Sequence, residues 1–245
     1  MRIPRIYTGP DALHPGTEVE LPDHAFRHTV HVLRLRPGAQ LVLFNGDGHD
    51  YPAQLANVER RRASAQIQER TPNASESALT LHLIQAISKA EHMDLTLQKA
   101  VELGVQMIQP VLSTRGLRLP ADRLARKLEH WRGVAVAACE QCGRSHIPHV
   151  REPLGLNAWL DTPPSPGGQR LLLEPTAPCG LDALAPAQGP TELLIGPEGG
   201  FAPDELAHAR RTGAVGVRLG PRVLRTETAG IVALALLQAR WGDLT

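Results

Sequence analysis

The sequence predicts an α/β protein in which a β-rich N-terminal domain precedes a larger domain built on a parallel sheet. Up to about residue 70, short apolar runs alternate with turn residues, as they do in antiparallel strands. From residue 79 onward, short apolar runs alternate with helical patterns, an arrangement that forms parallel sheets. A polar, proline-containing stretch at residues 71–77 separates the two patterns. We therefore expect two domains, residues 1–72 and residues 73–245.

Four strands are expected in the N-terminal domain. The clearest is the apolar run 41–44, because Asn45-Gly46 and Asp47-Gly48 follow it and such dipeptides favour tight hairpin turns. The other three strands are expected at residues 3–7, 19–21 and 63–68.

The C-terminal domain opens with a strand, a helix and a second strand. Residues 79–83 alternate between leucine and polar side chains, which predicts a strand. Ser88 and Glu91, three residues apart, have the pattern of a capping box that opens a helix. Residues 105–112 are the next strand candidate.

A long helix is expected next, with Asp122 as its cap and Gly143 as its stop. Two short apolar runs after it, residues 171–173 and 193–195, are typical of buried parallel strands, and Val217-Arg218-Leu219 is a further expected strand. The pattern Pro203-Asp204-Glu205 predicts a helix start after the second of these strands.

The last predicted helix, residues 230–241, is apolar almost all round. A helix without a polar face must be buried on every side. It is therefore expected inside the fold or at an interface between subunits.

Composition excludes several classes of protein. Of the 245 residues, 42% are hydrophobic and 21% are charged, which is typical of a packed globular protein and not of a disordered one. No run reaches the roughly 18–20 apolar residues of a membrane span, and the N-terminus lacks a secretory apolar region. We therefore expect a cytoplasmic protein without a membrane partner. The 26 Lys and Arg residues balance 25 Asp and Glu residues, so a polyanion would have to bind local basic patches.

Two loops after predicted strands are the strongest functional signals, because ligands bind at the carboxyl ends of strands in such sheets. The first loop is residues 196–201, with the sequence GPEGGF. Its glycines allow a ligand to approach the backbone closely, and a helix N-terminus follows it. The loop lacks the Lys-Ser/Thr of a P-loop and the spacing of a dinucleotide-binding fingerprint.

The second loop is residues 220–229, with the sequence GPRVLRTETA, directly before the apolar helix. Its charged residues, Arg222, Arg225 and Glu227, are costly at the mouth of a buried helix unless something pairs them. Two interpretations stay open: an internal Arg–Glu ion pair, or a binding site for a polar ligand.

Together, the two loops resemble the two signature loops of the knotted, SPOUT-class RNA methyltransferases. More closely, the chain is similar to the family of small-subunit (16S) ribosomal RNA uridine-N3 methyltransferases (RsmE type). The similarity runs nearly end to end: residues 2–5 and 31–38 resemble the family's PUA-like RNA-binding domain, and residues 98–105 and 140–144 resemble its middle motifs. The resemblance implies a deep trefoil knot in the C-terminal domain, a homodimer, S-adenosylmethionine as cofactor, and 16S rRNA in the small ribosomal subunit as partner.

The resemblance also implies that three strand ends of the C-terminal domain form the adenosine pocket, largely through backbone groups. The expected cofactor-binding residues are Leu173, Glu174, Pro175, Ile195, Gly196, Pro197, Glu198, Gly199, Gly200, Leu219, Gly220, Val223 and Leu224.

Methylation of uridine N3 needs no metal, because the methyl group of a sulfonium is already electrophilic. The N3 proton leaves only well above neutral pH, so the site must remove it or stabilise negative charge on O2 and O4. Arg225 is the preferred candidate for that stabilisation, Arg222 is the second, and Glu227 completes the expected catalytic set. Glu140, Glu198 and Glu227 are candidate bases, and the sequence does not choose among them.

RNA phosphates are expected to bind basic residues of the N-terminal domain and of one middle motif. The expected RNA-binding residues are Arg2, Arg5, Arg27, His31, Arg34, Arg36 and Arg144.

A zinc site is the main competing interpretation of one cluster, Cys139, Cys142, His146 and His149. The gap between the two pairs is too short for a zinc finger, and Cys142 lies on the apolar stripe of its helix, so we expect no metal. Two alternative functions stay open: a sister SPOUT methyltransferase acting on a tRNA base or a ribose 2′-hydroxyl, and a non-catalytic RNA-binding module.

Overall fold

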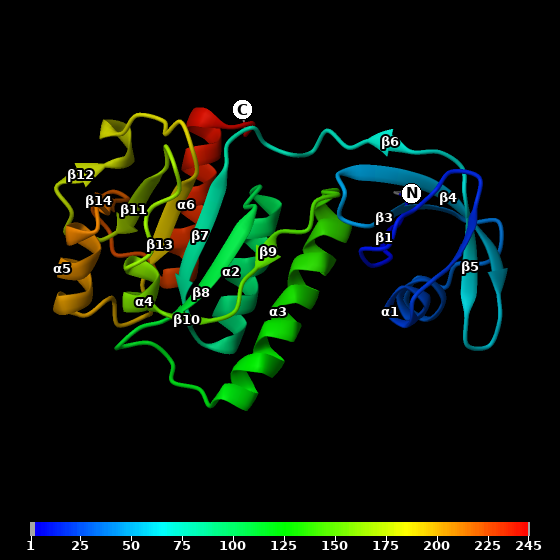
Figure 1. Ribbon diagram of the computed structural model, residues 1–245, viewed down its shortest axis with the longest axis horizontal. Coiled ribbons are helices and arrows are strands. Elements are labelled where there is room, and N and C mark those ends of the chain that lie inside the picture. Colours follow the sequence, from blue (N-terminus) through cyan, green and yellow to red (C-terminus); the bar gives the residue numbers. More distant parts are fainter. Residues whose placement is uncertain (1–2, 245) are drawn as a thin grey trace. The chain divides into compact units, whose positions relative to one another are not determined.

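The computed structural model describes residues 3–244 and divides into two compact units (Figure 1). Unit 1 comprises Met1–Glu76 and Val136–Ile147, and unit 2 comprises Ser77–Ala135 and Pro148–Thr245. Unit 1 ends a few residues beyond the expected boundary at residue 72, and it includes a second segment that sequence analysis did not anticipate. None of the helices in the described part of the chain is long and apolar enough to cross a membrane.

Unit 1 is built on a sheet with the order β1-β3-β4-β5-β2, and β6 pairs with β4. All four expected strands are present in it. The strands and helices are β1 (Arg5–Tyr7), β2 (Glu18–Glu20), α1 (Asp23–Phe26), η1 (Arg27–Val32), β3 (Gln40–Phe44), β4 (His49–Val58), β5 (Ala63–Ile67) and β6 (Thr71–Pro72).

The predicted hairpin joins β3 to β4, which pair antiparallel. Gly46 and Gly48 of its turn have φ angles of +97° and +83°, which glycine adopts without the steric strain that a side chain would cause. Alternate residues of both strands point into one core, in which Leu41, Leu43 and Tyr51 are almost completely buried.

Unit 2 is a parallel sheet with helices, and its strand order is β10-β8-β7-β13-β11-β14-β12, with β9 paired to β8 (Figure 1). Its strands are β7 (Leu81–Ala86), β8 (Met107–Leu112), β9 (His149–Val150), β10 (Leu154–Gly155), β11 (Gln169–Leu173), β12 (Cys179–Gly180), β13 (Thr191–Ile195) and β14 (Val215–Arg218). Its helical segments are α2 (Ala90–Glu102), α4 (Leu156–Leu160), η2 (Leu181–Ala183), α5 (Pro203–Arg211), α6 (Thr226–Trp241) and the first part of α3 (Ala121–Cys142).

The strand order of this sheet does not follow the chain. β13 lies between β7 and β11, and all five of its residues are buried, as expected for a central parallel strand. After β14 the chain returns as α6, which packs against α2 and β13. In this arrangement β13 is inserted between two strands from earlier in the chain, and the C-terminal helix α6 packs back against it. This path agrees with the expected trefoil knot.

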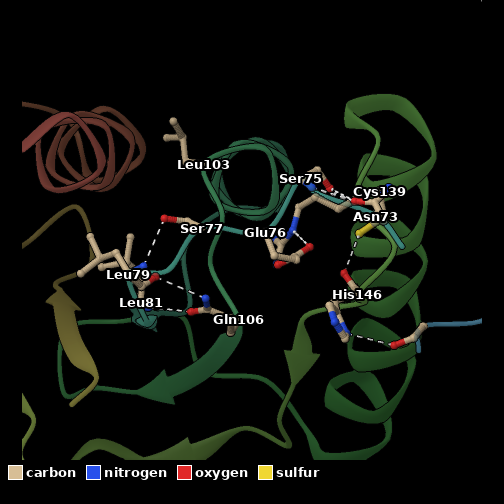
Figure 2. Close-up of polar contacts among 12 residues, drawn as sticks. Asn73, Ser75, Glu76, Ser77, Leu79, Leu81, Leu103, Gln106, Cys139 and His146 are labelled. Carbon is tan, nitrogen blue, oxygen red and sulfur yellow. Dashed lines mark hydrogen bonds and ion pairs between the residues drawn. The ribbon is translucent and has the colours of Figure 1, made fainter. Parts of the chain in front are cut away.

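The first strand of unit 2 begins at Leu81, later than the alternating pattern predicts. Gln106 holds the residues before it, because its Oε1 accepts the Leu81 N–H at 2.6 Å and its Nε2 donates to the Leu79 carbonyl at 3.3 Å (Figure 2). A side chain thus satisfies the backbone groups that a strand partner would otherwise bind.

Both helix caps expected in the first half of unit 2 are wrong. α2 begins at Ala90 with Lys89 at its N-cap position and no side-chain cap, and Ser88 Oγ is buried without a hydrogen bond among the described residues. Asp122 is the second residue of α3 and not its cap. The expected stop is confirmed: Gly143 has a φ of +100° and donates its N–H to the Cys139 carbonyl.

The last helix begins at Thr226, before the expected start at residue 230. Ala233, Leu234 and Leu237 are buried, but Leu236 is 47% exposed. The expectation that α6 is buried on every side therefore does not hold within a single chain. Because its apolar residues surround the helix, one part of them faces outward after the core-facing part is covered.

Candidate functional site

A cavity of about 630 Å³ lies at the carboxyl ends of β11, β13 and β14. Three chain segments wall it: residues 173–176, residues 195–201 and the stretch from the end of β14 into α6. His92 of α2 closes one side. The position is the one at which sheets of this kind bind ligands, and the volume is that of a small-molecule site.

Most of the expected cofactor-binding residues line this cavity. They are Leu173, Glu174, Pro175, Ile195, Gly196, Pro197, Glu198, Gly200, Leu219, Val223 and Leu224.

Gly199 and Gly220 are not among the lining residues. The Gly199 carbonyl accepts a hydrogen bond from Arg115 Nη1 at 3.1 Å, and a Cβ added at Gly199 would meet Arg115 at 3.6 Å. Gly220 has a φ of +76°, so it forms the turn that leaves β14. Both glycines shape loops around the cavity and do not face it.

Gly196, in the loop after β13, is a glycine that a residue with a side chain cannot easily replace. A Cβ at this position would lie 3.3 Å from the Phe201 nitrogen and 3.4 Å from its ring, closer than most Cβ contacts. The loop therefore folds back on itself at Gly196, with its backbone at the cavity surface.

A buried chain of hydrogen bonds ties this loop to the start of α6. Gln85 Nε2 donates to Thr226 Oγ1 at 3.2 Å, and Thr226 Oγ1 donates to the Gly196 carbonyl at 2.6 Å. Gln85 is fully buried and Thr226 is 7% exposed. Sequence analysis did not single out these residues, although a glutamine within the apolar strand β7 is itself a signal of a buried polar contact.

The start of α5 is fixed by one buried carboxylate. Glu205 is 3% exposed; its Oε2 accepts the Ala202 N–H at 2.8 Å and its Oε1 accepts the Thr114 N–H at 2.7 Å. The loop after β13 and the loop after β8 are therefore both anchored at the N-terminus of α5.

The structure brings the three expected catalytic residues, Arg222, Arg225 and Glu227, to the same cavity. Both arginine side chains are exposed, and within residues 3–244 neither forms an ion pair with Glu227. The Glu227 side chain is only 9% exposed, and its Oε2 has no hydrogen-bond partner in the described part of the chain. The structure thus does not contain the internal Arg–Glu pair, while the catalytic roles of these residues stay predictions.

His92 is a cavity residue that sequence analysis missed. Its Nδ1 lies 3.3 Å from Glu198 Oε1 and 3.7 Å from Glu227 Oε2. Burial raises the pKa of Glu198, but hydrogen bonds from its own N–H, from the Lys89 N–H and from His92 outweigh this effect and hold the pKa below its usual value. Glu198 is therefore a charged carboxylate at neutral pH.

Glu140 is not among the residues that line this cavity. It lies in unit 1, where its Oε1 accepts the Tyr7 N–H at 3.0 Å. Of the three candidate bases, Glu198 and Glu227 line the cavity, and the role of each stays a prediction.

Two of the expected RNA-binding arginines lie in internal ion pairs. Arg5 contacts Asp50 through both terminal nitrogens, at 2.8 and 2.9 Å, and its side chain is 9% exposed. Arg144 pairs with Glu76 at 2.7 Å, with its side chain 4% exposed. Neither is available to bind RNA phosphates, and we correct the expectation for both. Their acidic partners are distant in sequence, which concealed the pairing.

Arg2 lies outside the described residues. The remaining four, Arg27, His31, Arg34 and Arg36, are exposed on η1 and the loop that follows it. Arg34 has a φ of +54°, a conformation that is rare for residues other than glycine and that concentrates at functional positions. These four residues are therefore still candidates for an RNA-binding surface.

Cys139 of this cluster is buried in unit 1, whereas His146 and His149 are exposed and His149 belongs to unit 2. Cys139 Sγ donates to the His146 carbonyl at 3.5 Å (Figure 2), and burial raises the pKa of Cys139 to about 12. The residues that the structure describes include no group of three or more side chains placed to hold a metal ion.

Comparison with known protein families gives two matches. Residues 75–238 match the RNA methyltransferase domain family, and residues 21–68 match the RNA methyltransferase PUA domain family.

Curated relatives of the chain extend over nearly its whole length. A protein of Buchnera aphidicola named ribosomal RNA small subunit methyltransferase E is 31% identical over 99% of this chain and 95% of its own. A protein of the same name from Mycobacterium tuberculosis is 35% identical over 87% of this chain and 84% of its own.

Solved structures are similar over the full length. The ribosomal RNA small subunit methyltransferase E of Neisseria gonorrhoeae, bound to S-adenosylmethionine, is 40% identical with a TM-score of 0.93, and each chain is covered completely. A Legionella pneumophila structure with the same cofactor bound is 38% identical with a TM-score of 0.95, again over 100% of both chains.

Proposed function

Because the chain belongs to the family of ribosomal RNA small subunit methyltransferase E proteins, we propose that it transfers a methyl group from S-adenosylmethionine to uridine N3 of 16S rRNA. Membership of this family makes the chain an S-adenosylmethionine-dependent methyltransferase of 16S rRNA with a SPOUT fold and a PUA-like domain. We propose in addition that the methylated atom is N3 of a uridine. One observation supports it most: arginine and glutamate side chains converge on a single cavity.

The residues of the cavity fit the cofactor. Leu173, Ile195 and Leu224 offer apolar surface for an adenine ring, and the loop after β13 offers backbone groups. Glu227 Oε2 is buried and has no hydrogen-bond partner among the described residues, so it can accept a hydrogen bond from a bound ligand. When bound, S-adenosylmethionine supplies an electrophilic methyl group on a sulfonium.

The contribution of the protein is to place the uracil and stabilise its charge. Loss of the N3 proton puts negative charge on O2 and O4, and Arg225 or Arg222 can donate to these oxygens from the cavity wall. Glu227, on the first turn of α6, can accept a hydrogen bond from N3 before the proton leaves. Methyl transfer also requires that the methyl group and uracil N3 are aligned. The hydrogen bonds that anchor the loop after β13 and the start of α6 hold the cavity walls in place for this alignment.

Binding of rRNA is assigned to Arg27, His31, Arg34 and Arg36 of unit 1. Their exposed side chains provide the local positive patch that a nearly neutral chain needs to bind a polyanion. The assembled small subunit is the proposed substrate, and the cytoplasm, where ribosomal RNA is processed, is the proposed location.

A homodimer is proposed because apolar side chains are exposed on and near α6. Val223 is 80% exposed, Leu236 is 47% exposed and Val215 is 42% exposed. Exposed apolar surface of this kind marks an interface in a protein that is otherwise well packed.

The nucleoside product tests the proposal directly. Purified protein is incubated with methyl-labelled S-adenosylmethionine and small ribosomal subunits that lack the modification, and the rRNA is digested for mass spectrometry. We expect one 3-methyluridine per subunit. Label on a ribose 2′-hydroxyl or on tRNA would identify a sister methyltransferase, and RNA binding without label would identify a non-catalytic module.

A further inference from the structure

His92 lies between two carboxylates that come from two other elements. Glu198 belongs to the loop after β13 and Glu227 to the first turn of α6, while His92 is on α2. The His92 Nδ1 is 3.3 Å from the Glu198 carboxylate and 3.7 Å from the Glu227 carboxylate, and all three residues line the cavity. One imidazole therefore faces both acidic groups of the site.

The buried Glu227 carboxylate needs a hydrogen-bond donor or a positive charge beside it, whereas the Glu198 side chain is 42% exposed. The Glu227 side chain is 91% buried, since 9% is exposed, and its Oε2 has no hydrogen-bond partner in the described part of the chain. A buried carboxylate without compensation is strongly disfavoured, and a second carboxylate nearby adds repulsion. An imidazolium at this position would reduce both costs.

Other charged groups near the site do not replace His92. Arg222 and Arg225 line the cavity but form no ion pair with either carboxylate within residues 3–244. On α2 itself, Asp94 pairs with His130 at 2.8 Å, and Lys89 meets Glu198 through its backbone N–H at 3.4 Å. Glu91, also on α2, is exposed and adds a further negative charge.

We propose that His92 is a positioning residue that holds Glu198 and Glu227 in the orientation required to bind the cofactor. The proposal rests on the proposed function, because it assigns the same cavity to S-adenosylmethionine.

Two substitutions separate the charge of His92 from its size. His92→Gln keeps a polar side chain but removes the charge, and His92→Lys keeps a positive charge up to high pH. His130→Gln is the matched control, because His130 is a histidine with a carboxylate partner in the same unit but outside the cavity. Calorimetry measures S-adenosylmethionine affinity for each protein at pH 6, and kcat and KM are measured on small subunits.

We expect His92→Gln to bind S-adenosylmethionine about tenfold more weakly than wild type at pH 6, as the loss of a charge-assisted contact warrants. His92→Lys, which keeps a donor beside both carboxylates, should bind as tightly as wild type at pH 6, and His130→Gln should behave as wild type does.

Two results would overturn the proposal. They are a His92→Gln protein that binds the cofactor as tightly as wild type at pH 6, and a His92→Lys protein as weak as His92→Gln. If one variant fails to fold, the other variant still decides the question. The expected loss of affinity in His92→Gln, together with a wild-type protein that forms no 3-methyluridine, would refute the N3 assignment and leave the role of His92 intact.

Discussion

Arginine occurs in two different environments in this chain, and the difference determines what each residue can do. Arg5 is held by Asp50 and Ser145 in unit 1 and is almost completely buried. Arg225 is exposed at the cofactor cavity and has no ion pair with Glu227 among the described residues. A buried, paired arginine stabilises the fold, whereas an exposed one beside a cavity is free to bind a ligand.

Arg225→Ala should lower the methylation rate without much loss of cofactor affinity. If Arg225 stabilises charge on the uracil, its contact is stronger in the transition state than in the ground state, and its loss should cost about 10²–10³ in kcat. Single-turnover rates on small subunits and calorimetry with S-adenosylmethionine measure the two effects. Arg211→Ala, at the last turn of α5, is the control. Loss of cofactor binding with an unchanged maximal rate would contradict the assigned role.

The ion pair between Arg5 and Asp50 predicts that the stability of unit 1 falls in acid. Burial raises the pKa of Asp50, but hydrogen bonds from Arg5, Ser145 and Asn73 outweigh it and lower the pKa overall. A carboxylate with a lowered folded pKa stabilises the protein above its unfolded pKa of about 4, and this stabilisation is lost as pH falls through the folded value.

Asp50→Asn should therefore cost about 3 kcal/mol of unfolding free energy at pH 7, because it leaves Arg5 buried without its charge partner. The difference from wild type should shrink as pH falls below about 4, where the unfolded carboxylate takes up a proton, and should be lost once pH passes below the lowered folded pKa of Asp50. Denaturant unfolding at pH 7 and pH 3 measures it. Asp122→Asn, which removes an exposed pair with Arg126, should have almost no effect. Equal losses at both pH values would show that the charge of Asp50 is unimportant.

Sequence analysis located the cavity but not all the side chains within it. Strand ends and glycine loops are local patterns, so the loops containing Gly196 and Arg225 were identified correctly. His92 was missed because nothing on its own helix indicates that Glu198 and Glu227 lie within 4 Å of it. Arg5 and Arg144 were misassigned for the same reason, since ion pairing across distant segments leaves no local pattern.

At the level of elements, the N-terminus of α6 and the loop after β13 behave as one assembly. The hydroxyl of Thr226 accepts from Gln85 and donates to the Gly196 carbonyl, so it satisfies two buried groups at once. These buried hydrogen bonds tie both elements into one arrangement.

Thr226→Val should weaken S-adenosylmethionine binding about tenfold or more. The valine has nearly the same shape, but the Gly196 carbonyl loses its Thr226 donor, at about 1–3 kcal/mol for an unsatisfied buried group, and Gln85 Nε2 keeps only its bond to the Ala86 carbonyl. Calorimetry measures the affinity. Thr226→Ser keeps the hydroxyl and should bind nearly as wild type does, and Thr228→Val tests an exposed threonine of the same helix. Normal affinity of Thr226→Val would separate the hydrogen-bond chain from cofactor binding.

Element types followed well from the sequence, but element ends did not. The β3–β4 hairpin was predicted because its turn residues determine local backbone angles. The Ser88 capping box failed because Ser88 is buried before α2 begins, where tertiary packing overrides local preference. Likewise, the outward-facing part of α6 depends on what packs around the helix and not on its own apolar pattern.

For the whole molecule, exposed apolar side chains predict self-association. Leu236→Arg should convert a dimer into a monomer without unfolding the chain, because Leu236 is already 47% exposed. Light scattering at micromolar concentration measures the mass, and circular dichroism checks the fold. Leu154→Arg, at an exposed leucine of β10, is the control and should stay dimeric. A wild-type monomer under these conditions would refute the dimer.

The chain enters unit 1 twice, first with residues up to Glu76 and again with Val136–Ile147. In the second segment, the Glu140 carboxylate accepts the Tyr7 N–H and the Gly143 carbonyl accepts a hydrogen bond from the Asn73 side chain. The Ser145 hydroxyl of the same segment donates to the Asp50 carboxylate. A gene fragment that stops at codon 76 would therefore encode unit 1 without these partners. Recombination cannot exchange unit 1 as one continuous cassette, so the RNA-binding and methyl-transferring parts of this enzyme are expected to be inherited together.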